Sequence, residues 1–186
     1  MALVQQAARR VSFADLKSWP DDGRRYELYE GEVSVVPAPM PVHQQVVLRL
    51  AILLNAYAED HGGEAFVSPI DIVFTPFDVV QPDVAYFGQP ARTAIDVWSP
   101  IRAVPDLVVE VMSPGSVAGD RGRKMRAFER FGVPEYWVVD PVAETVEVHR
   151  REAGSYVLWQ HAGAADVVRS PNLPDLEFLA ADVFPV

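Results

Sequence analysis

The chain contains no cysteine, no long apolar run, and fewer basic than acidic residues. Without cysteine, disulfides, thiolate metal sites and thiol nucleophiles are excluded, and a reducing compartment is permitted. The longest apolar stretch, Val46 to Leu54, is interrupted by Arg49 and is too short to span a bilayer, and the N-terminus lacks the apolar core of a signal peptide. We therefore expect a soluble, cytoplasmic protein with no membrane partner.

Motifs of several common enzyme classes are also missing. There is no Gly-x-Ser-x-Gly elbow, no Walker A loop, no dinucleotide fingerprint and no His-Glu-x-x-His helix. The 16 basic and 26 acidic residues leave a formal net charge of −10, which disfavours a nucleic-acid partner because Lys and Arg drive phosphate binding. Acidic metal ligands lower the net charge of a hydrolase by themselves, however, and a local basic face can coexist with an acidic whole.

The length of 186 residues suits one domain with a single core, residues 1–186, in which 1–11 are a candidate disordered segment. Strands and helices alternate along the chain, which is typical of an α/β or α+β domain with a central mixed β-sheet flanked by helices. The predicted elements are a short helix at 12–19, a hairpin at 26–36, a long helix at 42–59, strands at 65–75 and 80–87, a loop at 88–103, a strand at 105–112, a second helix at 118–131, a strand at 135–140 and a late hairpin at 145–161.

Two acids on predicted neighbouring strands carry a chemical signal. Glu110 interrupts the run Leu107-Val-Val-Glu-Val-Met, where a buried strand favours hydrophobic residues. A buried carboxylate needs a cation, a proton or several donors, so Glu110 is either half of an ion pair or a metal ligand. Asp83 follows Pro82 and, taken alone, fits a strand start as well as a ligand. Together the two carboxylates predict a site for Mg²⁺, with Mn²⁺ as a substitute.

A lysine on the second predicted helix completes the pattern. Helical phasing places Lys124 near the middle of the apolar side, between the directions of Phe128 and Phe131. A lysine is almost never fully buried without a partner, so this one either extends to solvent or meets an acid such as Glu110. In a metal-dependent phosphodiesterase, a lysine in this position can stabilise or orient the nucleophile.

Two further residues are weaker candidates. Glu27 is an acid inside the apolar run Tyr26-Glu-Leu-Tyr, where it could equally be the outward residue of a half-exposed strand. His43 begins the long helix on its apolar stripe, where a histidine is more often a satisfied core or capping residue than a ligand.

At these residues the chain resembles the Uma-two family of candidate restriction endonucleases, within the PD-(D/E)XK nuclease superfamily. The resemblance covers roughly residues 13–150 and implies a restriction-endonuclease-like fold with Mg²⁺-dependent phosphodiester hydrolysis. The matching pieces are Tyr26-Glu-Leu-Tyr-Glu-Gly-Glu, His43, Gln81-Pro-Asp-Val-Ala-Tyr, Pro105-Asp-Leu-Val-Val-Glu-Val-Met-Ser-Pro-Gly-Ser, Asp120, Lys124 and Gly132-Val-Pro-Glu-Tyr-Trp-Val-Val-Asp-Pro.

The resemblance also implies roles for individual residues. Asp83 and Glu110 match the two acids of the motif, as metal ligands. The usual lysine, two residues after the second acid, falls at Met112, so the resemblance assigns its catalytic role to Lys124 on the following helix. Glu27 would be a further catalytic residue, as a ligand or a helper of the general base. His43 would act as a supporting donor.

The leading hypothesis is therefore a Mg²⁺-dependent endonuclease acting on nucleic acid, DNA rather than RNA. A homodimer is compatible with this function, because cutting both strands of a duplex takes two sites. Two alternatives stay open. One is a catalytically inactive nuclease-fold binding module in which Glu110 and Lys124 merely pair, supported by Met112 and the net charge. The other is a metal phosphohydrolase of small nucleotides, which fits an acidic surface.

Overall fold

The computed structural model describes residues 10–113 and 118–185 of the chain. The candidate disordered segment 1–11 therefore lies almost entirely outside the described residues. Its last two residues do pack on the protein: Val11 N donates to the carbonyl of Gly31 at 2.9 Å, and Arg10 Nε donates to the carbonyl of Glu30 at 2.7 Å.

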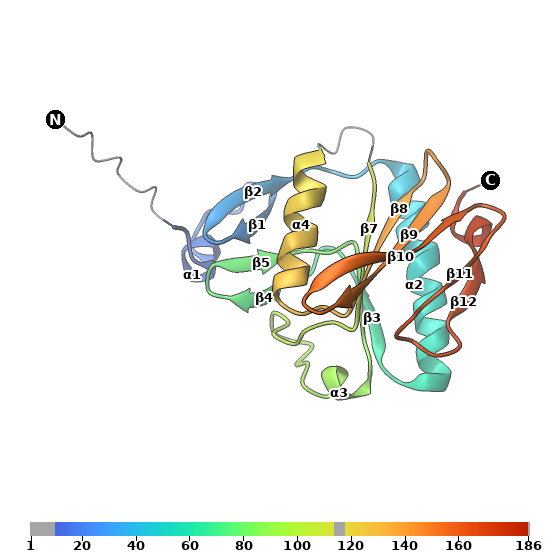
Figure 1. Cartoon of the computed structure of the whole chain (residues 1–186). Coiled ribbons are helices and arrows are strands. Elements are labelled where there is room, and N and C mark those ends of the chain that lie inside the picture. The colour runs from blue at the N-terminus through green and yellow to red at the C-terminus, as the bar shows by residue number, and fades with distance from the viewer. Residues whose placement is uncertain (1–9, 114–117, 186) are drawn as a thin grey trace.

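A six-stranded mixed sheet forms the centre of the molecule, in the order β10-β9-β8-β7-β6-β3 (Figure 1). Strands β7 and β8 are parallel and are connected through the helix α4 (Ala118–Arg130), whereas the other neighbouring pairs are antiparallel. The strands are β3 (Glu64–Val67), β6 (Val84–Phe87), β7 (Leu107–Val111), β8 (Glu135–Asp140), β9 (Thr145–Glu152) and β10 (Ser155–Gly163). The predicted fold class, a mixed sheet flanked by helices, is confirmed.

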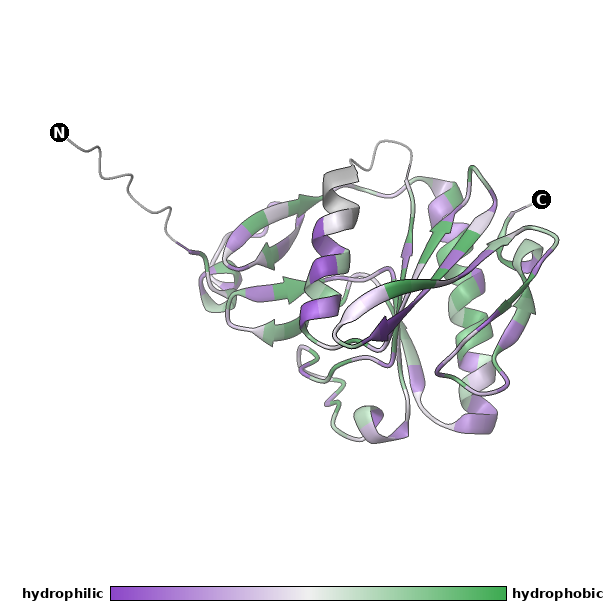
Figure 2. Cartoon of the chain, in the orientation of Figure 1, coloured by the Kyte–Doolittle hydropathy of each residue, from purple (hydrophilic) through white to green (hydrophobic). Residues whose placement is uncertain are grey.

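The two long helices cover opposite faces of this sheet, because successive side chains of a strand point to opposite sides. On one face, Val109 and its neighbours pack against α2 (Pro41–His61), whose Leu50 is fully buried. On the other face, Val108 packs in a cluster with Phe128 of α4. Figure 2 shows many hydrophobic residues in the strands of the sheet, whereas hydrophilic residues are frequent in the coloured part of α4. The core therefore has two layers, one on each side of the sheet.

A smaller sheet, ordered β2-β1-β5-β4, lies beside the central one (Figure 1). Its strands are β1 (Arg25–Tyr29), β2 (Glu32–Val36), β4 (Ile72–Thr75) and β5 (Asp78–Val80), and they follow the short helix α1 (Phe13–Lys17). Ser12 caps α1 in a reciprocal capping box with Asp15. The predicted hairpin turn at Glu30-Gly31 is confirmed, and both residues have positive φ, 53° and 86°, as the tight turn between two twisted strands requires.

Two strand predictions were too long. The predicted strand 65–75 is divided between β3 and β4, and the predicted strand 80–87 between β5 and β6, so each crosses from one sheet to the other. Pro69 and Pro82 lie at the two crossings. Proline has no N–H to donate to a strand ladder, so the pairing changes sheets there.

The remaining elements are short. The predicted loop 88–103 contains the helical turn α3 (Gln89–Arg92). Near the C-terminus, β11 (Val167–Arg169) pairs with β12 (Glu177–Leu179), and the 3-10 turn η1 (Ala180–Val183) follows. Over residues 10–113 and 118–185, no helix combines the length and the hydropathy that a membrane crossing requires.

Candidate active site

All five residues predicted from the sequence line one cavity of about 320 Å³. Glu27 comes from β1, His43 from α2 and Asp83 from the position before β6, whereas Glu110 lies on β7 and Lys124 on α4. The residues that line the cavity come mainly from the β1–β2 hairpin, the start of α2, β7 and α4, which are labelled in Figure 1. Folding therefore brings together side chains that are up to 97 positions apart, 27 to 124, in the sequence.

Asp83 and Glu110 lie on the same face of the central sheet. The antiparallel register of β6 and β7 joins Val84 to Val109, and one further step of this register places Asp83 opposite Glu110. Side chains of directly opposed residues lie on one face, with Cβ atoms roughly 5 Å apart. The Asp83 and Glu110 side chains remain 15% and 14% exposed. Two carboxylates are thus presented side by side to the cavity.

Lys124 reaches from α4 to these acids. Its Nζ lies 2.9 Å and 3.1 Å from the two carboxylate oxygens of Glu110 and 3.2 Å from Oε1 of Glu27. It also donates to the carbonyl of Gln81 at 3.3 Å. Phe128, one turn further along α4, is fully buried, so the helix presents this side to the sheet, as the phasing predicted. The ammonium is held by two carboxylates and a backbone carbonyl.

The acids and the lysine shift one another's protonation. Burial raises the pKa of Glu110 to about 8, against the opposing influence of Lys124 and with reinforcement from the carboxylates of Asp83 and Glu27. Burial would lower the pKa of Lys124, but the carboxylates around it hold that pKa well above its ordinary value. Lys124 is therefore an ammonium at neutral pH, and this single positive charge is shared between the carboxylates of Glu27 and Glu110. A second cation would favour the ionised form of Glu110.

Both carboxylate oxygens of Glu27 are already engaged in this arrangement. Oε2 accepts a hydrogen bond from the hydroxyl of Tyr29 at 2.9 Å, and Oε1 accepts one from the backbone N–H of Gln81 at 2.8 Å besides the contact with Lys124. Its side chain is only 3% exposed, so it is not the outward residue of a half-exposed strand. Burial raises the pKa of Tyr29, which keeps this phenol a hydrogen-bond donor.

His43, near the start of α2, contacts Asp83. Its Nε2 lies 3.0 Å from Oδ2 of Asp83, and the same oxygen accepts a hydrogen bond from the backbone N–H of Val111 at 2.8 Å. These contacts orient the carboxylate through Oδ2, and among the described residues no hydrogen bond engages its other oxygen, Oδ1. His43 belongs to the buried stripe of α2 together with Val47 and Leu50, which brings the imidazole to the start of β6.

The residues present fit a magnesium ion. No group of three or more His, Asp or Glu side chains placed to hold a metal occurs within residues 10–113 and 118–185, so the protein would supply two carboxylates, Asp83 and Glu110. Mg²⁺ retains several waters and is commonly held by one or two carboxylates together with substrate phosphates. Glu110 and Glu27 already hold one cation, the ammonium of Lys124.

Sequence reasoning missed Arg25 and Tyr29, which line the cavity together with Glu27. Since β1 is a strand, positions 25, 27 and 29 share one face, and the alternation around Glu27 was the signal that could have identified them. Met112, at the usual lysine position, packs with the hydrophobic cluster on the α4 side and lines the cavity too. The only amine that reaches the acids, among the described residues, is that of Lys124.

Together, the mixed sheet and the two acids facing a lysine place the chain in the restriction-endonuclease-like fold class. The model of the Uma2 family, described as "Putative restriction endonuclease", matches residues 13–182, so the chain belongs to this family, as the resemblance predicted.

One solved structure with a similar fold is described as a "putative nuclease belonging to DUF820 from Anabaena variabilis ATCC 29413". It superimposes with a TM-score of 0.75 at 18% sequence identity, over 94% of this chain and 97% of that chain. The comparison with curated proteins gives no match.

Proposed function

We propose that this protein is a Mg²⁺-dependent endonuclease that hydrolyses phosphodiester bonds in DNA, with Mn²⁺ as a substitute. The observation that carries the proposal is the placement of Asp83 opposite Glu110 with the ammonium of Lys124 2.9 Å from Glu110. Two adjacent carboxylates can hold a metal ion that assists phosphodiester hydrolysis, and a nearby ammonium can stabilise developing negative charge. The description of the family as restriction endonucleases favours DNA over RNA as the substrate.

Each residue has a role in this proposal. Asp83, through Oδ1, and Glu110 would hold the ion, which when bound supplies Lewis-acid charge at the phosphate oxygens and acidifies water. Lys124 would stabilise the negative charge that develops on the attacking oxygen. Glu27 would keep Lys124 in place, and His43 would keep Asp83 in the orientation that turns Oδ1 toward the ion. Substitution of such supporting residues commonly weakens metal binding 10–100-fold.

Calorimetric titration with Mn²⁺ tests the metal site. The wild type is expected to bind, and Asp83→Ala and Glu110→Ala are each expected to lose binding. Glu135→Gln, which changes a buried carboxylate outside the cavity, serves as the matched control and is expected to bind like the wild type. A wild type that does not bind Mn²⁺ would overturn the proposal in favour of a binding module without metal.

Cleavage assays then test the substrate. Supercoiled plasmid, single-stranded DNA, RNA and free nucleotides would be incubated with the wild type and Mg²⁺, with Glu110→Ala as the negative control. The wild type is expected to cleave DNA, and Glu110→Ala is expected to leave it intact. Hydrolysis of free nucleotides alone would instead identify a small-nucleotide phosphohydrolase, which the acidic composition suits. A homodimer belongs to the proposal only for a duplex substrate, because cutting both strands takes two sites; sedimentation equilibrium measures the oligomeric state directly.

A further inference from the structure

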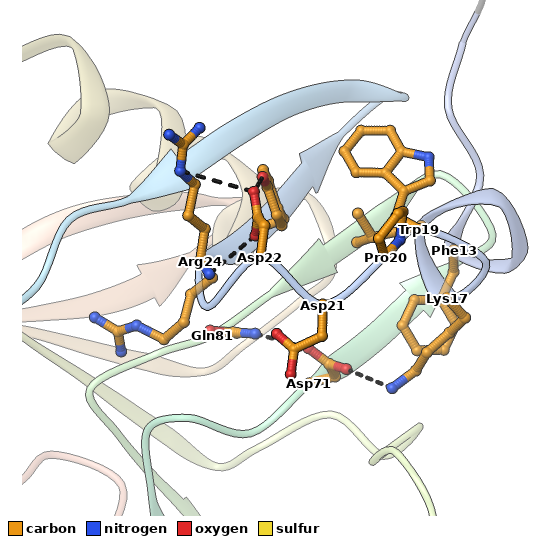
Figure 3. Close-up of a pocket in the computed structure, with 12 residues that line it drawn as sticks. Phe13, Lys17, Trp19, Pro20, Asp21, Asp22, Arg24, Asp71 and Gln81 are labelled. Atoms are coloured by element: carbon orange, nitrogen blue, oxygen red, sulfur yellow. Dashed lines mark hydrogen bonds and ion pairs between the residues drawn. The ribbon is translucent and has the colours of Figure 1, made fainter.

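A second cavity, of about 290 Å³, shares a wall with the candidate active site (Figure 3). Arg25 lines both cavities. Gln81 also connects them: its backbone N–H donates to Glu27, its carbonyl accepts from Lys124, and its side chain lines the second cavity. A molecule bound in the second cavity would therefore lie next to the proposed catalytic groups.

One end of the second cavity is aromatic. Trp19 is 40% exposed and makes an edge-on contact with Tyr26, with ring centroids 5.3 Å apart and an interplanar angle of 84°. Figure 3 shows Trp19 and Phe13 toward one end of the cavity and Arg24 at the other, with Asp71 and Gln81 between them. An exposed indole is a stacking surface for a flat ring, and every nucleobase has such a face.

Three acids line this cavity, and two of them have a cation beside them; the third, Asp21, accepts a hydrogen bond from the backbone N–H of Gly23 at 2.9 Å. Asp22 accepts a hydrogen bond from the hydroxyl of Tyr26 at 2.6 Å and lies 3.7 Å from Arg24. Asp71 lies 3.5 Å from Lys17 and accepts a hydrogen bond from Nε2 of the Gln81 side chain at 2.8 Å. Paired acids repel an anionic ligand less than free ones do, because each already has a donor or a cation beside it.

Arg25, in contrast, is a cation with only neutral partners. Its guanidinium donates to the hydroxyl of Ser68 at 2.8 Å and to the carbonyl of Pro37 at 2.9 Å, and it forms no ion pair with a carboxylate among the side chains that the structure describes, those of residues 10–113 and 122–185. A guanidinium presents a planar set of donors that matches a phosphate group. Its location between the two cavities is where the backbone of a nucleic acid would pass from one to the other.

The side chain of Gln81 forms part of the wall of the second cavity. Its Oε1 is buried and has no hydrogen-bond partner among the described residues. Its Nε2 donates to Asp71 at 2.8 Å, so the side chain is held in this wall of the cavity.

We propose that Arg25 and the second cavity form a nucleotide subsite for single-stranded nucleic acid, in which Arg25 binds the phosphate next to the scissile one and the neighbouring base stacks on Trp19. This inference rests on the proposed nuclease function. Bases inside a duplex are stacked on one another, whereas an unpaired base can turn its face to an aromatic side chain. The subsite therefore selects a single strand, or an unpaired nucleotide, beside the scissile bond.

Fluorescence anisotropy tests the base-binding part. A labelled ten-nucleotide DNA strand of mixed sequence, and the duplex made from it, would be titrated with the full chain in EDTA so that no cleavage occurs. The wild type is expected to bind the single strand more tightly than the duplex. Trp19→Ala is expected to weaken single-strand binding about ten-fold, and Trp19→Phe to retain most of it, which separates stacking from misfolding.

Trp98→Ala is the matched control, because Trp98 is 93% exposed and lines neither cavity; it is expected to bind like the wild type. Equal affinities of Trp19→Ala and Trp98→Ala would overturn the subsite, as would equal binding of single strand and duplex.

The salt dependence of binding tests the phosphate-binding part. Arg25→Gln is expected to lower the slope of log affinity against log salt concentration by roughly 0.7, the value for one phosphate contact on a single strand. Trp19→Phe is expected to keep the wild-type slope, because stacking releases no counterion. An unchanged slope in Arg25→Gln would remove Arg25 from the subsite.

Failure of the subsite and failure of the nuclease function are distinguishable. Hydrolysis of bis(p-nitrophenyl) phosphate by the wild type with Mn²⁺ measures phosphodiester chemistry on a substrate without a base. Hydrolysis combined with single-strand binding that does not depend on Trp19 would overturn the subsite alone. Trp19-dependent binding without hydrolysis would support the subsite and overturn the nuclease function.

Discussion

Two glutamates on the neighbouring parallel strands β7 and β8 are both largely buried, but their surroundings differ. Glu135 is fully buried and accepts hydrogen bonds from Trp137 Nε1 at 2.6 Å, Ser170 Oγ at 2.7 Å and Asn172 N at 3.2 Å. Glu110 keeps 14% exposure at a cavity and faces an ammonium. Burial raises the pKa of both carboxyls. A buried, pKa-shifted carboxylate is therefore not a site by itself; a cation and an opening toward a ligand make the difference.

Strand geometry explains why the two glutamates differ. In the parallel register, Leu107 pairs with Glu135 and Glu110 with Val138, so the glutamates lie at opposite ends of the strand pair. Glu135 begins its strand and is covered by the C-terminal segment through Ser170. Glu110 lies near the carboxyl end of β7, and ligands commonly bind outside the carboxyl ends of parallel strands.

The largest expected effect is on the rate of hydrolysis, and it distinguishes Glu110 from Glu135 directly. Glu110→Gln is expected to lower Mg²⁺-dependent hydrolysis of bis(p-nitrophenyl) phosphate about a thousand-fold, because an amide of the same size cannot supply the negative charge that holds the ion. Glu135→Gln is expected to keep the wild-type rate per folded molecule, since it is remote from the cavity. Initial rates, with folding checked by circular dichroism, measure both. Equal losses in the two variants would contradict the distinction between them.

Removing the ammonium is expected to have the next largest effect. Lys124→Ala is expected to lower the hydrolysis rate about a hundred-fold, because the developing negative charge loses its stabilising partner. The same change is expected to strengthen Mn²⁺ binding, since Glu110 and Glu27 are then free of their competing cation.

Arg126→Ala, on the exposed side of the same helix, is the control and is expected to change neither quantity. The hydrolysis rate and the Mn²⁺ affinity are measured in parallel for both variants. Weaker Mn²⁺ binding in Lys124→Ala would show that the lysine does not compete with the ion.

The raised pKa of Glu110 predicts a pH dependence that Glu135 does not share. Because that pKa lies near 8, Glu110 carries a proton at pH 6 that must leave when a metal binds, so Mn²⁺ affinity is expected to rise up to about ten-fold per pH unit and to level off above about pH 8. Calorimetry in buffers of different ionisation enthalpy counts the released proton. Affinity that is constant from pH 6 to pH 8 would contradict this.

In the absence of metal, the contribution of Glu110 to the free energy of unfolding depends on pH in the opposite direction: it falls as the pH rises. Between the ordinary pKa of 4.5 and about 8, folded Glu110 holds a proton that the unfolded chain releases. Its contribution to the free energy of unfolding is therefore complete below pH 4.5 and is lost as the pH rises toward 8.

The smallest expected effect concerns the support of Asp83. His43→Ala is expected to weaken Mn²⁺ binding about ten-fold, because Asp83 loses one of the two donors that orient it. His61→Ala, at the other end of the same helix, is the matched control and is expected to bind like the wild type. Identical affinities of the two variants in calorimetry would show that His43 fills space without supporting the acid.

Local sequence signals predicted most elements of the fold. The strand Glu135–Asp140 has the predicted bounds, and the turn at Glu30-Gly31 lies where its residues indicated. Apolar periodicity, caps and turn residues act between neighbours in the chain, so they can be read without the fold. The strands around Pro69 and Pro82 were misjudged because the choice between two sheets depends on partners that are distant in the sequence.

The candidate site also combines features that depend on sequence neighbours with features that depend on distant segments. The sequence by itself determined that Glu110 interrupts a buried strand and that Lys124 occupies the apolar side of its helix, because both follow from local periodicity. Only the tertiary structure decided that Asp83 lies opposite Glu110, that His43 reaches Asp83, and that Arg25 separates two cavities. These facts depend on strand register and on how distant segments pack, and no local pattern encodes either.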